Sequence, residues 1–308
     1  MLNWIRTLAL VATTSFLAAC GGGDDPPATT LSVAQGDSRF SILVEAVNAA
    51  GLAETLAGPG PLTVFAPTND AFAALLTELG VTKDALLADK ALLTAVLTYH
   101  VLPAKVERAA VPLGKAVTTV QGGIFKVDSV GSSLVITDGR NRNATITATD
   151  LSAGNGVVHV IDKVILPADK TLVQTAQALP QFSIHVEAVV AAGLVDALSG
   201  AGPFTVFAPT NDAFAALLAE LGVSKDALLA DKALLTQVLT YHVVPARVLK
   251  AQVPVGTPIT SLQGDSFTID ATLSITDQAG RTASIFATDV LASNGVIHVI
   301  DKVILPRL

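Results

Sequence analysis

The side chains best suited to chemistry in this sequence are two tyrosine–histidine pairs. Tyr99-His100 and Tyr241-His242 contain the only two tyrosines and two of the five histidines of the chain. A phenol and an imidazole can exchange protons, form hydrogen bonds or contact a partner. Val96 precedes Tyr99 by three residues, which places both rings near the apolar side of a helix. The favoured role is therefore structural, with rings packed in the core, and direct contact with a partner is the alternative.

Two further histidines lie in segments that are typical of buried strands. His159 and His298 each have a valine and an isoleucine two residues away, on the same face of an extended chain. A buried histidine that hydrogen-bonds to the backbone is the expected outcome. A zinc site needs three or four converging ligands, and the chain has one cysteine and no H-E-x-x-H pattern. We expect no metal and no cofactor.

The carboxylates that recur in the sequence have simpler roles than catalysis. They are Asp70, Asp212, Asp162 and Asp301. General acid–base chemistry needs a close pair of groups in contrasting environments, whereas helix capping or ion pairing with Lys163 and Lys302 accounts for these residues directly. The chain has no G-x-S-x-G, no phosphate-binding glycine loop and no calcium loop. The sequence therefore predicts no catalytic residue and no enzyme.

An internal duplication positions all these residues twice. Residues 64–104 align without gaps with 206–246, and residues 155–167 align with 294–306. A period of this length indicates two whole domains and not a solenoid of small units. We place the domains at 29–167 and 171–308. The linker 168–170 is too short to be flexible, so we expect restricted relative orientations.

Each copy changes its hydrophobic period along the chain. Apolar residues recur at helical spacing in the first third, and a short apolar strand follows at 63–65. The next helix is expected to start near Ala71, capped by Thr68 or Asn69, and a helix is predicted over 84–99 because this segment is rich in alanine and leucine. Beyond Pro103 the pattern alternates with period two, as in strands. Helices first and strands later indicate the α+β class.

The copies differ at a few positions. His185 stands where the first copy has Leu43, so we expect it near a helix boundary with no function shared between the copies. The run 140–143 (Arg-Asn-Arg-Asn) corresponds to 279–282 (Ala-Gly-Arg-Thr). This run is predicted to be a solvated hairpin tip that is free to vary, with a contact surface as the alternative.

Two sequence boxes resemble those of a known family. Residues 63–72 (TVFAPTNDAF) recur at 205–214, and residues 155–167 (NGVVHVIDKVILP) recur with one change at 294–306. With the Tyr-His pairs between them, these boxes resemble the signature of the fasciclin domain. The resemblance implies helices packed on a wedge-shaped β-sandwich, an extracytoplasmic role in adhesion or matrix interaction, and no established catalytic chemistry. It also makes Tyr99, His100, Tyr241 and His242 candidate partner-binding residues, because the family's tyrosine–histidine region is associated with receptor binding in animals.

The N-terminus is predicted to be a targeting segment. Residues 1–19 combine Arg6, a short apolar run and small residues, as in a signal peptide. Leu17-Ala18-Ala19-Cys20 resembles the lipobox of bacterial lipoproteins, which implies lipidation of Cys20, the only cysteine. Residues 20–28 would then form a flexible tether. Gly21 after the cysteine favours the outer membrane, so we expect a lipid-anchored protein of the cell envelope.

Charge and composition argue against one class of function, nucleic-acid binding. The net charge is −7 and no basic run or stripe is present, which argues against nucleic-acid binding. The leading hypothesis is a surface adhesion or interaction protein that is bivalent for a protein or matrix partner. The alternative is an envelope protein that binds a small apolar or polymeric ligand in a cleft between the helices and the sheet.

Overall fold

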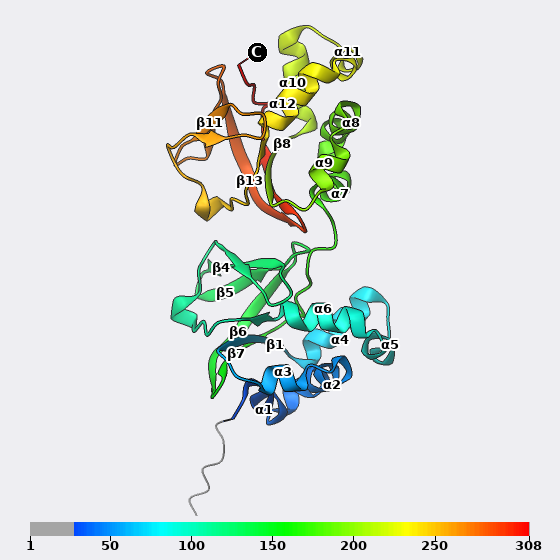
Figure 1. Cartoon of the computed structure of the whole chain (residues 1–308), viewed down its shortest axis with the longest axis vertical. Helices are drawn as coiled ribbons and strands as arrows, with labels where there is room; N and C mark the ends of the chain where they lie inside the picture. Colours follow the sequence, from blue (N-terminus) through cyan, green and yellow to red (C-terminus); the bar gives the residue numbers. More distant parts are fainter. Residues whose placement is uncertain (1–27, 308) are drawn as a thin grey trace, which may run out of the picture.

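The computed structural model describes residues 28–307 as two α+β domains stacked end to end (Figure 1). The predicted signal peptide, Cys20 and all but the last residue of the tether lie outside the described residues. In each domain a seven-stranded mixed sheet nearly closes into a barrel, and the helices pack against it. The α+β class predicted from the change in hydrophobic period is confirmed. No helix within residues 28–307 combines the length and apolar character needed to cross a membrane.

The first domain contains six α-helices, two short 3₁₀ turns and seven strands among its described residues. In chain order they are α1 (Thr30–Gln35), η1 (Ser38–Phe40), α2 (Ser41–Ala50), α3 (Ala53–Ala57), β1 (Leu62–Pro67), α4 (Asn69–Leu79), α5 (Lys83–Ala88), α6 (Lys90–Tyr99), β2 (Val101–Leu102), η2 (Arg108–Ala110), β3 (Ala116–Thr118), β4 (Ile124–Val130), β5 (Ser133–Thr137), β6 (Asn143–Ala153) and β7 (Gly156–Ile161).

The second domain repeats this order with small differences in strand length. Its elements are α7 (Leu172–Gln177), η3 (Pro180–Phe182), α8 (Ser183–Ala192), α9 (Val195–Ser199), β8 (Phe204–Pro209), α10 (Asn211–Leu221), α11 (Lys225–Ala230), α12 (Lys232–Tyr241), β9 (Val243–Val244), η4 (Lys250–Gln252), β10 (Ile259–Thr260), β11 (Ser266–Ile269), β12 (Ser274–Thr276), β13 (Thr282–Ala292) and β14 (Gly295–Ile300).

The two family boxes supply adjacent strands of the sheet. In the first domain the strand order is β2-β1-β7-β6-β5-β4-β3, and β1 pairs with β7 in parallel. Val64 and Ala66 of β1 face the core under the helices, whereas Phe65 faces the core inside the curled sheet. Both faces of β1 and β7 are therefore buried, which explains why these boxes are nearly continuous apolar runs.

N-cap side chains set where the helix after β1 begins and divide the segment 84–99 into two helices. The Thr68 hydroxyl accepts a hydrogen bond from the Ala71 backbone N–H, so Thr68 is the N-cap of α4, as predicted. The single helix predicted over 84–99 is wrong. The chain breaks at Asp89, whose carboxylate caps the second helix, α6, through the Leu92 N–H at 3.0 Å. The capping side chain outweighs the helix propensity of the surrounding residues.

Candidate functional site

Both tyrosines of the Tyr-His pairs are inside the sheet core. Tyr99 ends α6 and is fully buried, with its hydroxyl donating to the Ile124 carbonyl at 2.5 Å. Tyr241 is placed the same way and donates to the Ser266 carbonyl at 3.1 Å. Each ring meets a phenylalanine of the sheet edge-to-face. Burial raises the pKa of Tyr99 well above its usual value and that of Tyr241 to about 12, so neither phenol ionises at neutral pH.

Both histidines of the pairs are buried with both ring nitrogens occupied. His100 Nε2 accepts from the Ile165 N–H at 3.1 Å, which leaves the ring proton on Nδ1 to donate to the Val96 carbonyl at 2.7 Å. His242 makes the same pair of contacts in the second domain. Burial lowers the pKa of each ring to about 4. A neutral imidazole held this way has no free nitrogen for a substrate or a metal.

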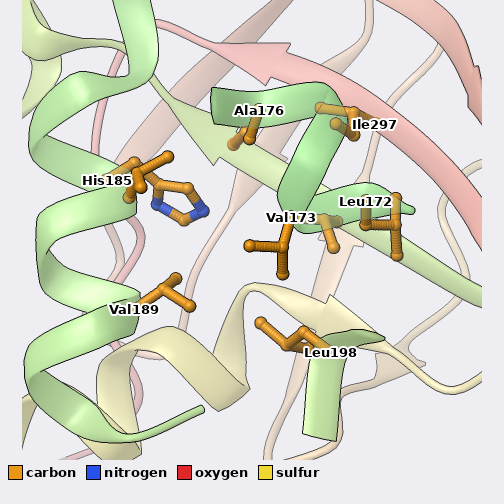
Figure 2. A pocket seen from close by; sticks show the side chains of 10 residues that line it. Leu172, Val173, Ala176, His185, Val189, Leu198 and Ile297 are labelled. Atoms are coloured by element: carbon orange, nitrogen blue, oxygen red, sulfur yellow. The ribbon is translucent and has the colours of Figure 1, made fainter. Parts of the chain in front are cut away.

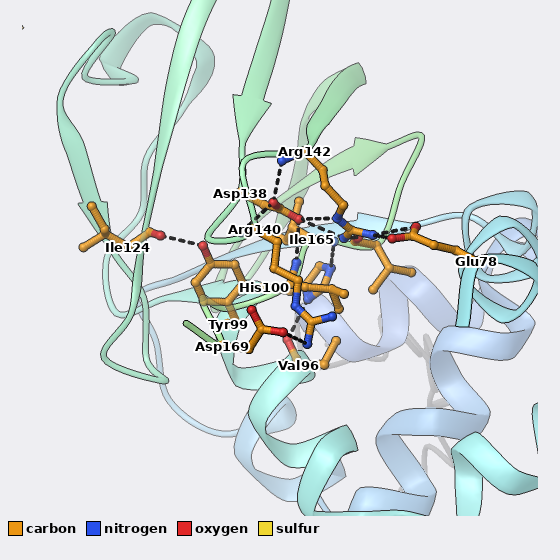
Figure 3. Close-up of polar contacts among 12 residues, drawn as sticks. Glu78, Val96, Tyr99, His100, Ile124, Asp138, Arg140, Arg142, Ile165 and Asp169 are labelled. Atoms are coloured by element: carbon orange, nitrogen blue, oxygen red, sulfur yellow. Dashed lines mark hydrogen bonds and ion pairs between the residues drawn. The ribbon is translucent and has the colours of Figure 1, made fainter. Parts of the chain in front are cut away.

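A buried carboxylate completes the site next to His100 (Figure 3). Asp138 is 1% exposed, and its Oδ2 accepts from the Leu166 N–H at 2.9 Å. The same carboxylate binds the Arg142 guanidinium at 2.8 and 3.0 Å, and Arg142 reaches on to Glu78 at 2.7 Å. Asp277 repeats the backbone bond in the second domain, to the Leu305 N–H at 2.9 Å.

His100 and Asp138 together hold two consecutive backbone amides, those of Ile165 and Leu166. These amides belong to the last segment of the domain, which therefore joins α6 to the β5–β6 hairpin. The arrangement fastens the fold and has no exposed acid, base or nucleophile. The role of the four Tyr-His side chains in partner binding stays a prediction. Sequence reasoning missed Asp138, although its recurrence as Asp277, each with an arginine four residues later, is a visible signal.

His159 and Asp162 also bind backbone groups. His159 is buried and contacts the Val106 carbonyl at 2.8 Å, so the backbone-satisfied histidine predicted there is confirmed. Asp162 does not pair with Lys163 in the part of the chain that the structure describes. Its carboxylate accepts from the Thr145 N–H at 2.6 Å, because β6 presents an amide there. Residues 28–307 contain no group of three or more histidine, cysteine or acidic side chains arranged to hold a metal ion.

The space between the helices and the sheet was the predicted cleft for a small ligand. In the second domain it is lined by apolar side chains and by His185 of α8 (Figure 2). The volume open to the centre of a water molecule is about 20 Å³, and the matching space in the first domain is the same size. A volume of this size accommodates one water molecule. In this conformation the space is too small for a larger ligand.

The hairpin tip 140–143 contacts the second domain, which corrects the expectation of a solvated tip. The Asn141 side chain donates to the Leu291 carbonyl at 3.0 Å and accepts from the Leu291 N–H at 2.6 Å. Lys126 of β4 forms an ion pair with Asp289 at 2.9 Å, and both side chains are largely buried. The asparagine that makes both bonds is replaced by Gly280 in the second copy.

An apolar cluster lies between these polar contacts and connects the domains. It consists of Ile124, Leu249, Leu291 and Val296. In the first domain the positions equivalent to Leu249 and Leu291 are Glu107 and Ser152. Two polar residues are thus replaced by leucines at the surface that becomes an interface. Sequence reasoning missed this signal, which a comparison of the two copies makes visible. The junction supports the restricted orientation expected from the short linker.

Replacing Asn141 with glycine is expected to loosen the junction while keeping both domains folded. Asn141 has a φ of 61°, so glycine fits the backbone without strain, and glycine is the residue of the second copy at Gly280. Loss of two hydrogen bonds should weaken domain coupling by about 1–2 kcal/mol. Small-angle scattering should show a broader distribution of interdomain distances. Gly280→Asn, at the other tip, is the control and should leave the scattering unchanged.

Comparisons with known proteins identify the family to which these two domains belong. The family model described as "Fasciclin domain" matches residues 38–167 and 180–306. Over 153 residues the chain is 47% identical to Protein sll1483 of Synechocystis, covering 48% of this chain and 81% of that protein. Over 251 residues it is 31% identical to transforming growth factor-beta-induced protein ig-h3 of Sus scrofa, covering 81% of this chain and 35% of that protein. The chain therefore spans about a third of the length of ig-h3.

A solved structure of a domain pair also matches the chain. It is a FAS1 domain pair from the insect cell adhesion molecule fasciclin I. The match covers 85% of this chain and 95% of that one, with 20% sequence identity and a TM-score of 0.42.

Proposed function

The chain belongs to the fasciclin domain family, and from this premise we propose that it is a bivalent, non-catalytic interaction protein of the bacterial cell surface. Its partner would be a protein or matrix component outside the cell. The Tyr-His motif presents no exposed acid or base for catalysis, because its titratable groups are buried and bind backbone groups. The family resemblance to adhesion proteins supports the same proposal, and fold alone would not.

The observation that carries the proposal is the fixed pairing of two similar domains. Asn141, the Lys126–Asp289 ion pair and the apolar cluster hold the domains against each other. Two modules at constant spacing bind a partner with matching repeats more tightly than either does alone, since the second contact forms at high effective concentration. A flexible linker would dilute this effect. The junction thus gives the duplication a functional consequence.

We further propose that a lipid on Cys20 anchors the pair to the cell envelope, at the outer membrane. The support is the Leu17–Cys20 sequence and the Gly21 that follows it. More than one acyl chain makes such an anchor stable, whereas one chain alone binds reversibly. The polar residues up to position 28 would carry the domains away from the bilayer. Metabolic labelling with a radioactive fatty acid tests the anchor, and a labelled Cys20→Ser variant would contradict it.

Cell attachment is the direct test of the proposed function. A deletion strain should adhere to matrix-coated surfaces or to partner cells less than the wild type, and a chain with a single domain should restore adhesion only in part. The Asn141→Gly variant should fall between these, because it keeps both domains and loses their fixed spacing. Equal adhesion by all strains on every surface tested would rule out an attachment role. A negative result in the labelling experiment would contradict the lipid anchor alone, and a negative result in the adhesion assay would contradict the attachment role alone.

Tyr99→Phe separates the structural role of the motif from partner binding. The substitution removes one buried hydroxyl and its bond to the Ile124 carbonyl, and should lower the free energy of unfolding by about 1 kcal/mol. Adhesion at a temperature where the variant is folded should be unchanged, because the hydroxyl is not at the surface. Urea unfolding and the attachment assay provide the two measurements. Lost adhesion with unchanged stability would instead assign the motif to the partner interface.

A further inference from the structure

The junction between the domains contains a cleft that the proposed function does not use. It is bounded by the turn 121–124 of the first domain, by Pro167 and Ala168, and by the end of the β13–β14 hairpin of the second domain. The volume open to the centre of a water molecule is about 350 Å³. This size is within the range of small-molecule sites. The cleft exists only in the domain pair, because each domain supplies part of its wall.

Of the residues that the structure describes, Arg247 is the one ionisable side chain that lines this cleft. Its Nε is buried and has no hydrogen-bond partner within residues 28–307. Burial lowers the pKa of the guanidinium, and no carboxylate of residues 28–307 offsets that effect. A half-buried cation without a counterion is unfavourable in a folded protein. The side chain is well placed to accept an anion from outside.

The equivalent cation of the first domain has an acidic partner that Arg247 lacks within residues 28–307. Lys105, the equivalent of Arg247, forms an ion pair with Glu107 at 2.9 Å. In the second domain the position of Glu107 is taken by Leu249, which is fully buried in the junction cluster. At the junction an apolar side chain thus stands where the first domain has a carboxylate, while both domains have a cation two residues earlier. In the second domain this cation is an arginine, whose planar fork binds carboxylates in two-point fashion.

The loop that carries Arg247 is held firmly in place. The next residue, Val248, binds Thr205 Oγ1 through its N–H at 2.9 Å and His298 Nε2 through its carbonyl at 2.8 Å. Both partners are buried in the second domain. A rigid backbone at this point reduces the ordering cost of capturing a ligand on the guanidinium.

We propose that the junction cleft is a binding site for a small carboxylate ligand, with Arg247 as the residue that recognises the carboxylate. One positive charge with no acidic neighbour in the lining matches a monoanion better than a doubly charged phosphate. The remaining volume would take the neutral body of the ligand. Acidic sugars and free peptide C-termini are two sources that share this chemistry. The site does not depend on the proposed attachment role.

The test follows the Nε–H signals of arginine by NMR in the full two-domain chain. Acetate, glucuronate and N-acetylglycine are titrated against sodium chloride at constant ionic strength. The Arg247 signal, identified by its loss in Arg247→Gln, should shift and saturate at millimolar carboxylate, which corresponds to roughly 4 kcal/mol of binding. The Arg39 signal should drift without saturating, because its guanidinium is exposed and already paired with Asp37.

Variants then distinguish specific carboxylate binding at Arg247 from a general effect of salt on the protein. Ligand-induced thermal stabilisation should disappear in Arg247→Gln, fall at least tenfold in apparent affinity in Arg247→Lys, and persist in Lys105→Gln, the matched change in the first domain. Tighter binding of glucuronate than acetate would indicate an acidic sugar, and tighter binding of N-acetylglycine a peptide end. A shift of Arg247 that never saturates, or stabilisation that survives in Arg247→Gln, would overturn the proposal.

Discussion

Replacing Asp138 with alanine is expected to lower the free energy of unfolding of the first domain by about 3–5 kcal/mol, the usual cost of removing one partner of a buried ion pair. The carboxylate is 1% exposed and accepts bonds from the Leu166, Arg140 and Arg142 backbone amides as well as the Arg142 guanidinium. Alanine leaves these buried donors without an acceptor. The C-terminal segment of the domain would also lose one of its side-chain attachments, leaving those of His100 to Ile165 and of Arg142 to Val164.

Asp277→Ala in the second domain is the matched control for this prediction. Asp277 accepts three backbone bonds, to residues 279, 281 and 305, but the nearby Arg281 pairs with Glu220 instead. The expected loss is smaller, about 2 kcal/mol, because no ion pair is broken. Hydrogen exchange resolved by mass spectrometry reports each domain separately. Equal losses in the two variants would show that the Asp138–Arg142 pair adds nothing to stability.

Acid is expected to unfold the second domain before the first. Burial lowers the pKa of His242 to about 4 and that of His185 to about 3, and it lowers the pKa of His298 as well. In the first domain, burial lowers the pKa of His100 to about 4. Histidine in the unfolded chain titrates near pH 6.5, so protonation favours the unfolded state. Stability should hold above pH 7 and fall as the pH drops from 6.5 to 4.

The size of this effect follows from the separation between folded and unfolded pKa values. Each of His100, His185 and His242 should cost on the order of 3 kcal/mol by pH 4. The second domain carries two of them and should lose about twice as much as the first. Urea unfolding at pH 7.5 and 4.5, followed by domain-resolved hydrogen exchange, provides the measurement. Parallel loss in both domains would contradict the prediction.

His185→Leu isolates the largest single contribution, since leucine is the residue of the first domain at position 43. His185 is buried in an apolar cavity with an unpartnered Nδ1. Burial lowers its pKa, and His242, once protonated, adds to the lowering. The variant should gain about 1–3 kcal/mol at pH 7.5, from removal of an unsatisfied polar group. It should gain more at pH 4.5. Leu43→His in the first domain should have the opposite effect at both pH values.

Much of the fold could be predicted because it is encoded locally. The change of hydrophobic period gave the α+β class, and Thr68 capped α4 where its side chain could reach the first free amides. His159 could be placed in a core because its neighbours at two-residue spacing are apolar. Competition between side-chain and backbone hydrogen bonds was harder to predict. The helix expected over 84–99 broke at Asp89, where a carboxylate competes with the backbone of the preceding turn.

The partners of the buried polar groups could not be predicted from the sequence. Asp138 meets Leu166, and His100 meets Ile165, across separations of 28 and 65 residues. Sequence periodicity tells which face of an element is buried, but the atom opposite that face depends on how distant elements pack. The same limit explains Asp162, which binds a backbone amide of β6 and not the adjacent Lys163.

The sequence by itself determined that this protein is a duplicated fasciclin-type chain, because near-identical repeats and apolar boxes are properties of residue order alone. Only the tertiary structure decided what the duplication builds. Asn141, Leu249 and Arg247 acquire their roles from a neighbouring domain whose surface no local pattern describes. The free energy of such a contact depends on which polar and apolar groups are buried against each other. That is decided only when the two folded surfaces pack together.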